Sequence, residues 1–464
     1  MTMSEIIPVR TVEPHAPAHP KKVKAASSDN LIHTRSFTGL FRTLRVSGAG
    51  FLFLAFFGTV WLNWGGRQAV LWDLAESKFH IFGATFWPQD FILLSALLII
   101  CAFGLFAITV FAGRVWCGYT CPQSSFTWLF MWCEKITEGE RNQRIKLQAA
   151  PWSLNKLARR SAKHTLWLGI SMLTGLTFVG YFTPIRPLAT ELLTWQMGGV
   201  SLFWVLFFTA ATYINAGWLR EAVCMHMCPY ARFQSVMFDK DTLIVSYDPR
   251  RGEVRGPRKK GADYKAQGLG DCIDCTMCVQ VCPTGIDIRD GLQIECIGCA
   301  ACIDACDNIM DKMDYPRGLI SYTTEHNLSG QKTHKLRPRL IGYALVLLAM
   351  MSLLATAFFM RSLVGFDVSK DRVLYRENAE GRIENVDSLK VMNKDQRDHV
   401  YVLEAKGLPN LRLEGAREIR VAAGDIVSLP VQLSVSPELL PSTTNEVIFI
   451  RSDADDSASE VEAK

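Results

Sequence analysis

The stretch DCIDCTMCVQVCPTG, residues 271–285, decides the fold in the middle of the chain. It contains four cysteines, Cys272, Cys275, Cys278 and Cys282, and a proline follows the last of them. The stretch CIGCAACIDAC, residues 296–306, repeats the same spacing with four more cysteines, Cys296, Cys299, Cys302 and Cys306. The repeat indicates one module with two similar sets of ligands.

The doubled C-x2-C-x2-C-x3-C spacing is typical of bacterial two-cluster ferredoxins, in which the fourth cysteine of each set binds the other cluster. We therefore expect one [4Fe–4S] cluster on Cys272, Cys275, Cys278 and Cys306. The other cluster is expected on Cys296, Cys299, Cys302 and Cys282. Zinc also binds C-x2-C pairs, but zinc sites rarely use four cysteines so densely spaced, and rarely twice. The pattern predicts transfer of single electrons.

Four further cysteines form two C-x3-C-P pairs, in VWCGYTCPQ (Cys117 and Cys121) and in AVCMHMCPY (Cys224 and Cys228). Residues four apart share one face of a helix, and the prolines at 122 and 229 mark a break or a new first turn. Each pair follows an apolar segment, so all four thiolates could share one soft metal ion at the membrane surface. With His226 as a tentative further ligand, this donor set favours Cu(I).

Other interpretations of the paired cysteines remain open. They could form a dithiol/disulfide switch, or bind a further iron–sulfur centre or another redox group. Met225 and Met227, which flank His226, are better explained as packing side chains than as ligands. Cys101, inside an apolar segment, and Cys133, alone in a loop, are expected to be structural.

Five stretches without a charged residue are close to the roughly 20 residues that a helix needs to cross a bilayer. They are Val46–Trp64, Phe91–Phe111, Thr165–Phe182, Gly198–Trp218 and Leu340–Met360. After the last of them the pattern changes to short alternating segments such as VSLPVQLSV, which indicate an antiparallel β-sandwich. The predicted fold class is an α-helical membrane protein with five transmembrane helices, a two-cluster ferredoxin-like insert and a C-terminal Ig-like β-sandwich.

Basic residues predict the orientation in the membrane, because Lys and Arg gather in cytoplasmic segments. Residues 1–45, 112–164 and 219–339 carry 33 of them, whereas residues 65–90 and 183–197 carry 3. The N-terminus and the ferredoxin-like insert should therefore be cytoplasmic and the C-terminal domain periplasmic. The net charge of +5 reflects this orientation and gives no reason to expect nucleic-acid binding.

These patterns divide the chain into seven parts. They are a flexible cytoplasmic arm (1–45), a four-helix transmembrane core with both C-x3-C-P motifs (46–239), a basic linker (240–267), the ferredoxin-like domain (268–325), a fifth transmembrane helix (340–360), a periplasmic Ig-like sandwich (361–452) and a disordered tail (453–464).

The order of these parts, together with GRQAVLWDL, CGYTCPQ and CMHMCPYARFQSVMFDKDTLIVSYD, resembles the cytochrome c oxidase accessory proteins called CcoG, FixG or RdxA. The resemblance covers residues 35–450. It implies a bacterial inner-membrane protein that reduces Cu(II) to Cu(I) and assists the assembly of cbb3-type cytochrome oxidase. On this resemblance the paired cysteines are the catalytic copper-binding residues, and copper is the substrate.

A quinol dehydrogenase subunit is the main alternative function. Paired C-x3-C-P motifs with a ferredoxin module also occur in the membrane subunit that passes quinol electrons toward periplasmic nitrate reductase. That subunit lacks the fifth helix and the β-sandwich. A third possibility is a scaffold whose clusters sense redox state. The expected partners are the membrane, cbb3-type oxidase or its copper-delivery factors, and an electron donor that the sequence does not identify.

Overall fold

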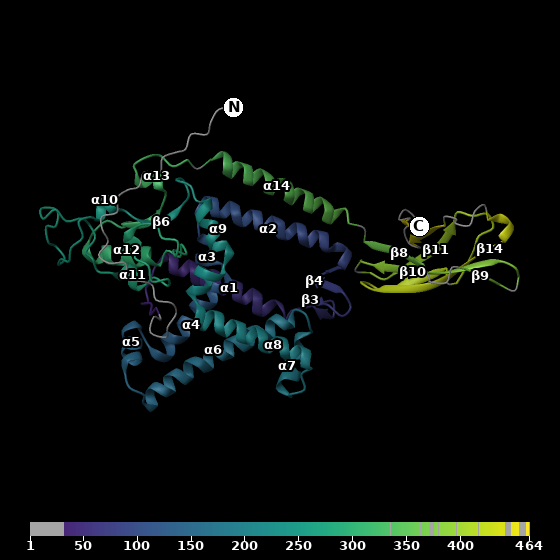
Figure 1. The fold of residues 1–464 in the computed structure, drawn as a ribbon, viewed down its shortest axis with the longest axis horizontal. Helices are drawn as coiled ribbons and strands as arrows, with labels where there is room; N and C mark the ends of the chain where they lie inside the picture. The colour runs from purple at the N-terminus through teal and green to yellow at the C-terminus, as the bar shows by residue number, and fades with distance from the viewer. Residues whose placement is uncertain are drawn as a thin grey trace.

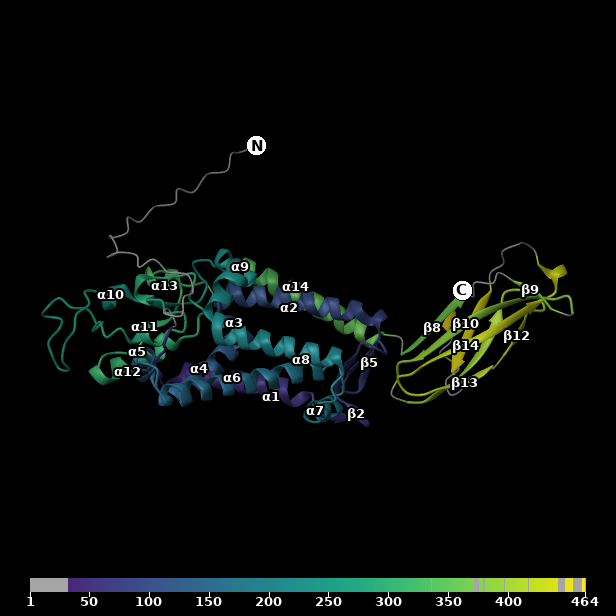
Figure 2. The ribbon, with the colours of Figure 1, turned by 60° about the horizontal axis from the view of Figure 1, so that its bottom comes forward.

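The computed structural model describes residues 32–463, with gaps at 335, 362, 371–374, 379, 396, 416, 441–446 and 454–460. A helical bundle lies between a loop-rich, cysteine-rich region at one end and a β-sandwich at the other (Figure 1, Figure 2). We call these the ferredoxin end and the sandwich end. Most of the predicted flexible arm, residues 1–31, lies outside the described residues.

The bundle is made of long helices that run between the two ends (Figure 2). They are α1 (Leu40–Thr59), α2 (Phe91–Ala112), α6 (Leu154–Gly180), α8 (Gly199–Thr212) and α14 (Pro338–Phe359). Within the described residues, four helical segments are long and apolar enough to cross a membrane, at Leu40–Thr59, Pro88–Ala112, Gly199–Leu219 and Pro338–Phe359. Their exposed apolar surfaces fit a lipid environment, so the chain is a membrane protein.

The third of the five predicted spans, Thr165–Phe182, is not among these four segments. These residues belong to α6, which begins at Leu154 and ends at Gly180. The first half of α6 carries Lys and Arg, and Lys156 and Lys163 are buried there. These charges lower the mean hydropathy of the helix, although α6 runs between the same two ends as the other long helices (Figure 2) and packs along α8. The sequence pattern showed the apolar half of this helix and missed its charged beginning.

Short helices connect the bundle to its surroundings. On the ferredoxin side these are α3 (Val115–Tyr119), α4 (Pro122–Glu138), α5 (Arg141–Ala149), the π-helical turns η3 (Tyr213–Leu219) and η4 (Val223–Met227), and α9 (Pro229–Met237). On the sandwich side, α7 (Ile185–Leu193), the ribbon β1 (Asn63–Trp64) and β2 (Arg67–Gln68), and the sheet of β3 (Val70–Asp73), β4 (Lys78–Ile81) and β5 (Ala84–Phe86) cover the helix ends.

A two-stranded sheet closes the ferredoxin end. Strands β6 (Ile244–Tyr247) and β7 (Ile320–Thr323) pair antiparallel and enclose the cysteine-rich segment between them. The enclosed helices are α10 (Pro249–Gly252), α11 (Met277–Gln280), η5 (Ile288–Asp290) and α12 (Ala301–Met313). The buried side chains of Val245 and Tyr247 belong to the core of this region. Part of the predicted basic linker, 240–267, therefore belongs to the ferredoxin fold.

Two antiparallel sheets form the sandwich. One contains β12 (Arg412–Glu414), β14 (Ile426–Val435), β10 (Ile383–Asn393), β8 (Val364–Lys370) and β9 (Arg376–Glu377); the other contains β13 (Glu418–Val421), β11 (His399–Lys406), β15 (Ile448–Asp453) and β16 (Val461–Ala463). Apolar side chains from both sheets form one core. The predicted sandwich is confirmed. The predicted disordered tail is corrected at residues 461–463, because β16 pairs with β15 there.

A buried ion-pair cluster joins the sandwich to the bundle. The carboxylate of Asp90, just before α2, lies 3.1 Å from Lys394 Nζ and 3.4 Å from an Arg361 guanidinium nitrogen. All three side chains are largely buried. Removing one partner of such a cluster leaves a buried charge without compensation, so the contact couples the sandwich to the start of α2.

Candidate functional site

The two cysteine-rich loops share an unusual backbone conformation. The residues on either side of the second cysteine have positive φ in both loops: Asp274 (53°) and Thr276 (54°), and Gly298 (65°) and Ala300 (58°). Thr276 then begins α11 and Ala300 begins α12 as left-handed N-cap residues. Left-handed residues other than glycine are uncommon and cluster at functional sites. The two loops therefore repeat each other in backbone conformation as well as in cysteine spacing.

The eight cysteines of these loops line two hollows. The first is lined by Cys272, Cys275, Cys278 and Cys306. The second is lined by Cys282, Cys296, Cys299 and Cys302, and Cys278 also reaches it. Thus Cys306 lies with the first loop and Cys282 with the second, so that each loop lends its last cysteine to the other hollow.

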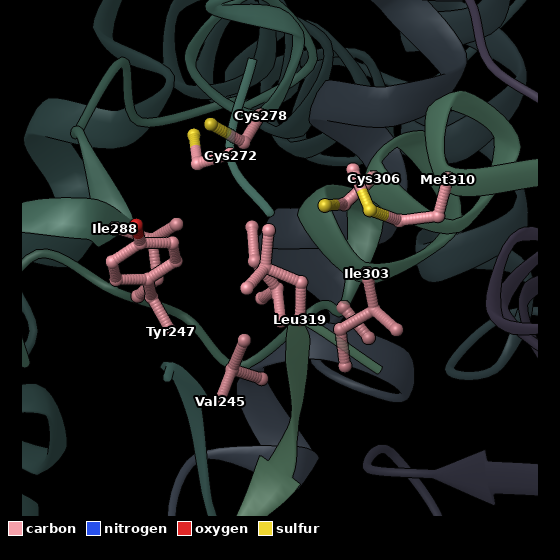
Figure 3. Close-up of a cluster of buried hydrophobic side chains, with 11 residues drawn as sticks. Val245, Tyr247, Cys272, Cys278, Ile288, Ile303, Cys306, Met310 and Leu319 are labelled. Carbon is pink, nitrogen blue, oxygen red and sulfur yellow. The ribbon is translucent and has the colours of Figure 1, made fainter. Parts of the chain in front are cut away.

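Apolar side chains surround the first hollow. Figure 3 shows Cys272 and Cys278 side by side, with Cys306 from α12 and the side chains of Tyr247 and Leu319 in the same buried cluster. Four thiols in an apolar hollow are the donor set of an iron–sulfur cluster. The residues present therefore fit two [4Fe–4S] clusters.

Burial makes these thiols difficult to ionise without a metal. It raises the pKa of Cys278 and of Cys296 to about 12. The pKa of Cys306 is also raised, first by burial and then by the neighbouring Cys278, Cys275 and Cys272. Thiolates so crowded need a compensating positive charge, which iron ions supply.

The C-x3-C-P pairs lie where helices begin again. Pro122 is the first residue of α4, directly after Cys121, and Pro229 is the first residue of α9, directly after Cys228. The structure thus has a new first turn at each proline, one of the two outcomes that the sequence allowed. Because Cys117 and Cys224 lie on the preceding short helices α3 and η4, each pair spans a bend between two helices.

The two pairs are close enough to influence one another. The pKa of Cys117 is raised to about 12, first by burial and then by Cys121 and, more weakly, Cys224. The pKa of Cys224 is raised to about 11, first by burial and then by Cys121 and Cys228. Both thiols therefore stay protonated near neutral pH in the absence of a metal ion.

The paired sulfurs do not form a closed site for a single ion. Among the described residues, no three potential ligand atoms from these four cysteines and His226 lie within 4.8 Å of one another. The His226 side chain is exposed, and so is Met227. To share one ion, the four sulfurs would have to move together. Otherwise, each pair would bind an ion of its own.

The first pair lies directly against the second ferredoxin loop. A Cβ atom on Gly118 would lie only 2.9 Å from Cys299 Cα and 2.9 Å from the Gly298 carbonyl oxygen. Cys117 and Cys299 belong to the same buried cluster. Only glycine allows α3 to approach the loop so closely, which places this pair next to the second hollow.

Polar side chains reinforce this junction. The Arg114 guanidinium donates hydrogen bonds to the carbonyl oxygens of Ile294, Cys296 and Ala231. Tyr322 donates to the Gly298 carbonyl at 2.5 Å. Arg114 therefore ties the start of α3 to both the second ferredoxin loop and α9.

Sequence reasoning did not identify the residues that build this junction. The Cys117 thiol donates to Gln234 Oε1 at 3.6 Å, and Gln234 is fully buried on α9. Arg114, Gly118, Tyr322 and Gln234 occupy no ligand position of the cysteine motifs. Gly118, inside the pair, gave the one available signal, because glycine in a helix often marks a close approach.

Comparisons with known proteins agree with this geometry. Residues 219–325 match the model of a 4Fe–4S dicluster domain, and residues 94–138 match that of a 4Fe–4S binding domain. Residues 354–464 match the Ig-like fold at the C-terminus of FixG. RdxA of Cereibacter sphaeroides is 36% identical over 444 residues, covering 92% of this chain and 93% of RdxA. This chain belongs to the FixG/RdxA family.

Two further FixG/RdxA relatives are similar to it. RdxB of the same organism is 37% identical over 421 residues, covering 87% of this chain and 88% of RdxB. The nitrogen fixation protein FixG of Rhizobium meliloti is 42% identical over 271 residues, which are 57% of this chain and 52% of FixG. A crystal structure of a FixG-related protein from Vibrio parahaemolyticus matches 22% of this chain and 94% of its own at 32% identity, with a TM-score of 0.20.

Family and fold together define the protein broadly. It is a FixG/RdxA-type iron–sulfur electron-transfer protein of the membrane, with an Ig-like domain at its C-terminus. The predicted family and fold class are confirmed, apart from the third span.

Proposed function

We propose that this protein is a membrane-bound cupric reductase, and that the paired cysteines Cys117, Cys121, Cys224 and Cys228 bind the copper substrate. When bound, [4Fe–4S] clusters supply single electrons, and one electron converts Cu(II) to Cu(I). The observation that carries the proposal is the backbone contact between Gly118, inside the first pair, and Cys299 of the second ferredoxin loop. It brings a thiol pair next to a redox site.

The residues of the pairs suit the reduced ion. Thiolates prefer Cu(I) to Cu(II), so binding at sulfur favours reduction. Cys117 is buried beside Gln234, and this shields a bound ion from water on one side. Cys121, Cys224 and Cys228 are partly exposed, which leaves a path for the ion to enter and leave. His226, exposed next to the second pair, would be a further ligand.

We place the protein in the bacterial inner membrane, with the ferredoxin end in the cytoplasm and the sandwich in the periplasm. The excess of Lys and Arg on the ferredoxin side supports this orientation. The Cu(I) would serve the assembly of cbb3-type cytochrome oxidase, directly or through copper-delivery factors. A reduced electron donor would dock at the ferredoxin end.

The test is an anaerobic Cu(II)-reduction assay with the full-length protein and a chemical reductant. Cys117→Ser/Cys121→Ser and Cys224→Ser/Cys228→Ser should each lower the rate at least tenfold while iron content stays unchanged. Cys101→Ser, in α2, is the matched control and should keep the full rate. Unchanged copper reduction in both double variants would refute the proposal, and a loss of quinol oxidation instead would favour a quinol dehydrogenase subunit.

One observation favours a second candidate for the paired cysteines. Residues 94–138, which include Cys117 and Cys121, match a 4Fe–4S binding model. The spread of the sulfurs also suits a group larger than one ion. In that case the pairs would bind a further iron–sulfur centre that relays electrons to quinone or another acceptor. Iron content above eight per chain, lost on mutation of the pairs, would establish it.

A further inference from the structure

Asp241, His326 and His334 bring three metal-binding side chains together outside the cysteine sites. Asp241 lies in the turn between α9 and β6, His326 lies on α13 (Glu325–Leu328), and His334 lies in the loop that leads to α14. One potential ligand atom from each lies within 4.8 Å of the other two. Among the described residues, no other group of His, Cys, Asp or Glu meets this condition.

Both imidazoles face the same carboxylate. Nδ1 of His326 lies 2.8 Å from Asp241 Oδ1, and Nδ1 of His334 lies 3.7 Å from Asp241 Oδ2. The two rings are 6.1 Å apart at their centroids and nearly perpendicular, at 80°. Two imidazole nitrogens and one carboxylate oxygen thus lie close together, and the two rings do not stack on one another.

The backbone holds these side chains in place. The His334 amide donates to Asp241 Oδ1 at 3.0 Å, and the His326 amide donates to the Lys240 carbonyl at 3.1 Å. The loop between the histidines is fixed by the Gln331 amide, which donates to the His326 carbonyl at 2.7 Å. Preorganised ligands bind with less loss of conformational entropy, so the arrangement suits a binding site.

The site is open on one side. The Asp241 side chain is 12% exposed and that of His326 is 22% exposed, whereas that of His334 is 72% exposed. A metal ion could enter from the His334 side and complete its coordination with water. A site of this kind exchanges its ion with the solution, unlike a closed structural zinc site with four protein ligands.

We infer that Asp241, His326 and His334 form a binding site for a divalent transition-metal ion, and that Cu(II) is the ion it takes. Two imidazoles and one carboxylate suit Cu(II), Ni(II) or Zn(II) rather than Ca²⁺ or Mg²⁺, which prefer oxygen ligands alone. Among these ions Cu(II) binds most tightly. The choice of Cu(II) over the other ions rests on the proposed function. The inference that these three side chains bind a divalent transition-metal ion does not.

This inference gives the two oxidation states different sites. Nitrogen and oxygen ligands at Asp241, His326 and His334 suit the oxidised ion, and the sulfur pairs suit the reduced one. The segment after Asp241 leads from this site toward the first cysteine pair. Leu243 and Ile244 line a cavity of about 160 Å³ that is also lined by Arg114 and Cys296, beside the first pair. Ions captured from solution would therefore be concentrated near the place of reduction.

The test is electron paramagnetic resonance of Cu(II) bound to the full-length protein. The four paired cysteines are changed to serine so that Cu(II) is not reduced, and oxidised [4Fe–4S] clusters give no signal of their own. One equivalent of Cu(II) should show hyperfine splitting from imidazole nitrogen. His326→Gln/His334→Gln should lose this signal and weaken binding at least tenfold, with unchanged iron content.

Two controls make the result specific. His33→Gln removes a histidine on the same side of the bundle, bonded to Gln148, and should leave the signal unchanged. His334→Gln alone, at the exposed position, should weaken Cu(II) binding without affecting the fold. Retention of the nitrogen splitting and affinity in the double variant would overturn the site and leave a purely structural hydrogen-bond cluster. If the protein with all its cysteines bound Cu(II) at this site but reduced no copper, the proposed function would be refuted and this site would be supported.

Discussion

The two cysteine-bearing regions of this protein use the same side chain in opposite ways. In the ferredoxin loops, eight cysteines line two apolar hollows, and each loop lends one cysteine to the other hollow. In the C-x3-C-P pairs, four cysteines lie at bends between short helices, and three of them are partly exposed. The first arrangement suits a resident cofactor, and the second suits a ligand that comes and goes.

The difference follows from what surrounds the sulfurs. The ferredoxin loops are fixed by left-handed residues at equivalent positions and by a core that includes Tyr247 and Leu319. The pairs lie at bends between helices, and the first of them packs against the second loop at Gly118. No three of their four described sulfurs lie within 4.8 Å of one another. A site that must release Cu(I) cannot be as closed as one that keeps iron. The two regions should therefore respond differently to the same change.

Replacing one cysteine in each region should have the largest effect. Cys306→Ser should remove one cluster and lower iron from about eight to about four per chain, because Cys306 completes the first hollow. It should also abolish copper reduction, because it interrupts electron supply. Cys224→Ser should leave iron unchanged and lower copper reduction alone. Iron analysis and electron paramagnetic resonance of the reduced protein measure the clusters in both variants, and the Cu(II)-reduction assay measures their activity. Loss of iron in Cys224→Ser would show that the pairs also bind iron.

The affinity of the pairs for Cu(I) should rise steeply with pH. The pKa of Cys117 is raised to about 12 and that of Cys224 to about 11, mainly by burial. Below these values both thiols are protonated, so an ion that binds at either pair displaces the proton of the high-pKa thiol in that pair, Cys117 or Cys224. The affinity of each pair should therefore increase at least about tenfold per pH unit between pH 6 and 8. Competition with a Cu(I) chelator of known pH dependence measures this slope.

Cys117→Ser is the control for this pH effect. Without the Cys117 thiol the first pair loses the group whose proton the ion displaces, so only the second pair, with Cys224, should keep this pH dependence. An affinity that does not change with pH would mean that the ion binds at groups already deprotonated, such as a neutral histidine.

A buried charge cluster should support the second pair. Glu134, on α4, is almost completely buried and pairs with Arg220 at 2.6 Å and with Arg144 at 3.1 Å. Arg220 lies four residues before Cys224 and has a positive φ of 42°. Glu134→Gln leaves these cations without compensation and should destabilise the protein by about 3–5 kcal/mol. Thermal unfolding, followed by intrinsic fluorescence, measures the change.

Glu140→Gln is the matched control. Glu140 pairs with Lys135 at 3.0 Å at an exposed position, where an ion pair contributes about 1 kcal/mol or less. If both variants unfolded at the same temperature, the charge cluster around Glu134 would not hold this region together.

The parts of the molecule that depend on local spacing could be predicted from the sequence. The two cysteine sets, the apolar helices and the alternating strands all repeat within a few residues, so their periods are visible. The helix α6 was misjudged because only its second half is apolar, while Lys156 and Lys163 are buried in its first half. A charged residue buried by tertiary contacts looks the same in a sequence as an exposed one.

Contacts between distant segments could not be predicted in this way. Asp90 and Lys394 are 304 residues apart, and Asp241 and His326 are 85 residues apart. No period connects such residues, and each one alone has an ordinary explanation as a surface charge. The paired cysteines were visible as motifs, but their contact with the ferredoxin loop depends on the fold.

The smallest expected effect tests that contact directly. Gly118→Ala adds a Cβ atom that would lie 2.9 Å from Cys299 Cα, and backbone on both sides leaves little room to adjust. The helix and the loop must separate slightly, which should cost about 1–3 kcal/mol in stability. Gly104→Ala is the matched control in α2, because its Cβ would have no neighbour within 4 Å. Electron transfer depends on proximity, so Gly118→Ala should slow copper reduction several-fold with both clusters intact, and Gly104→Ala should not. Equal rates in the two variants would mean that electrons reach the pairs by another route, because the only change at Gly118 is the distance across this junction.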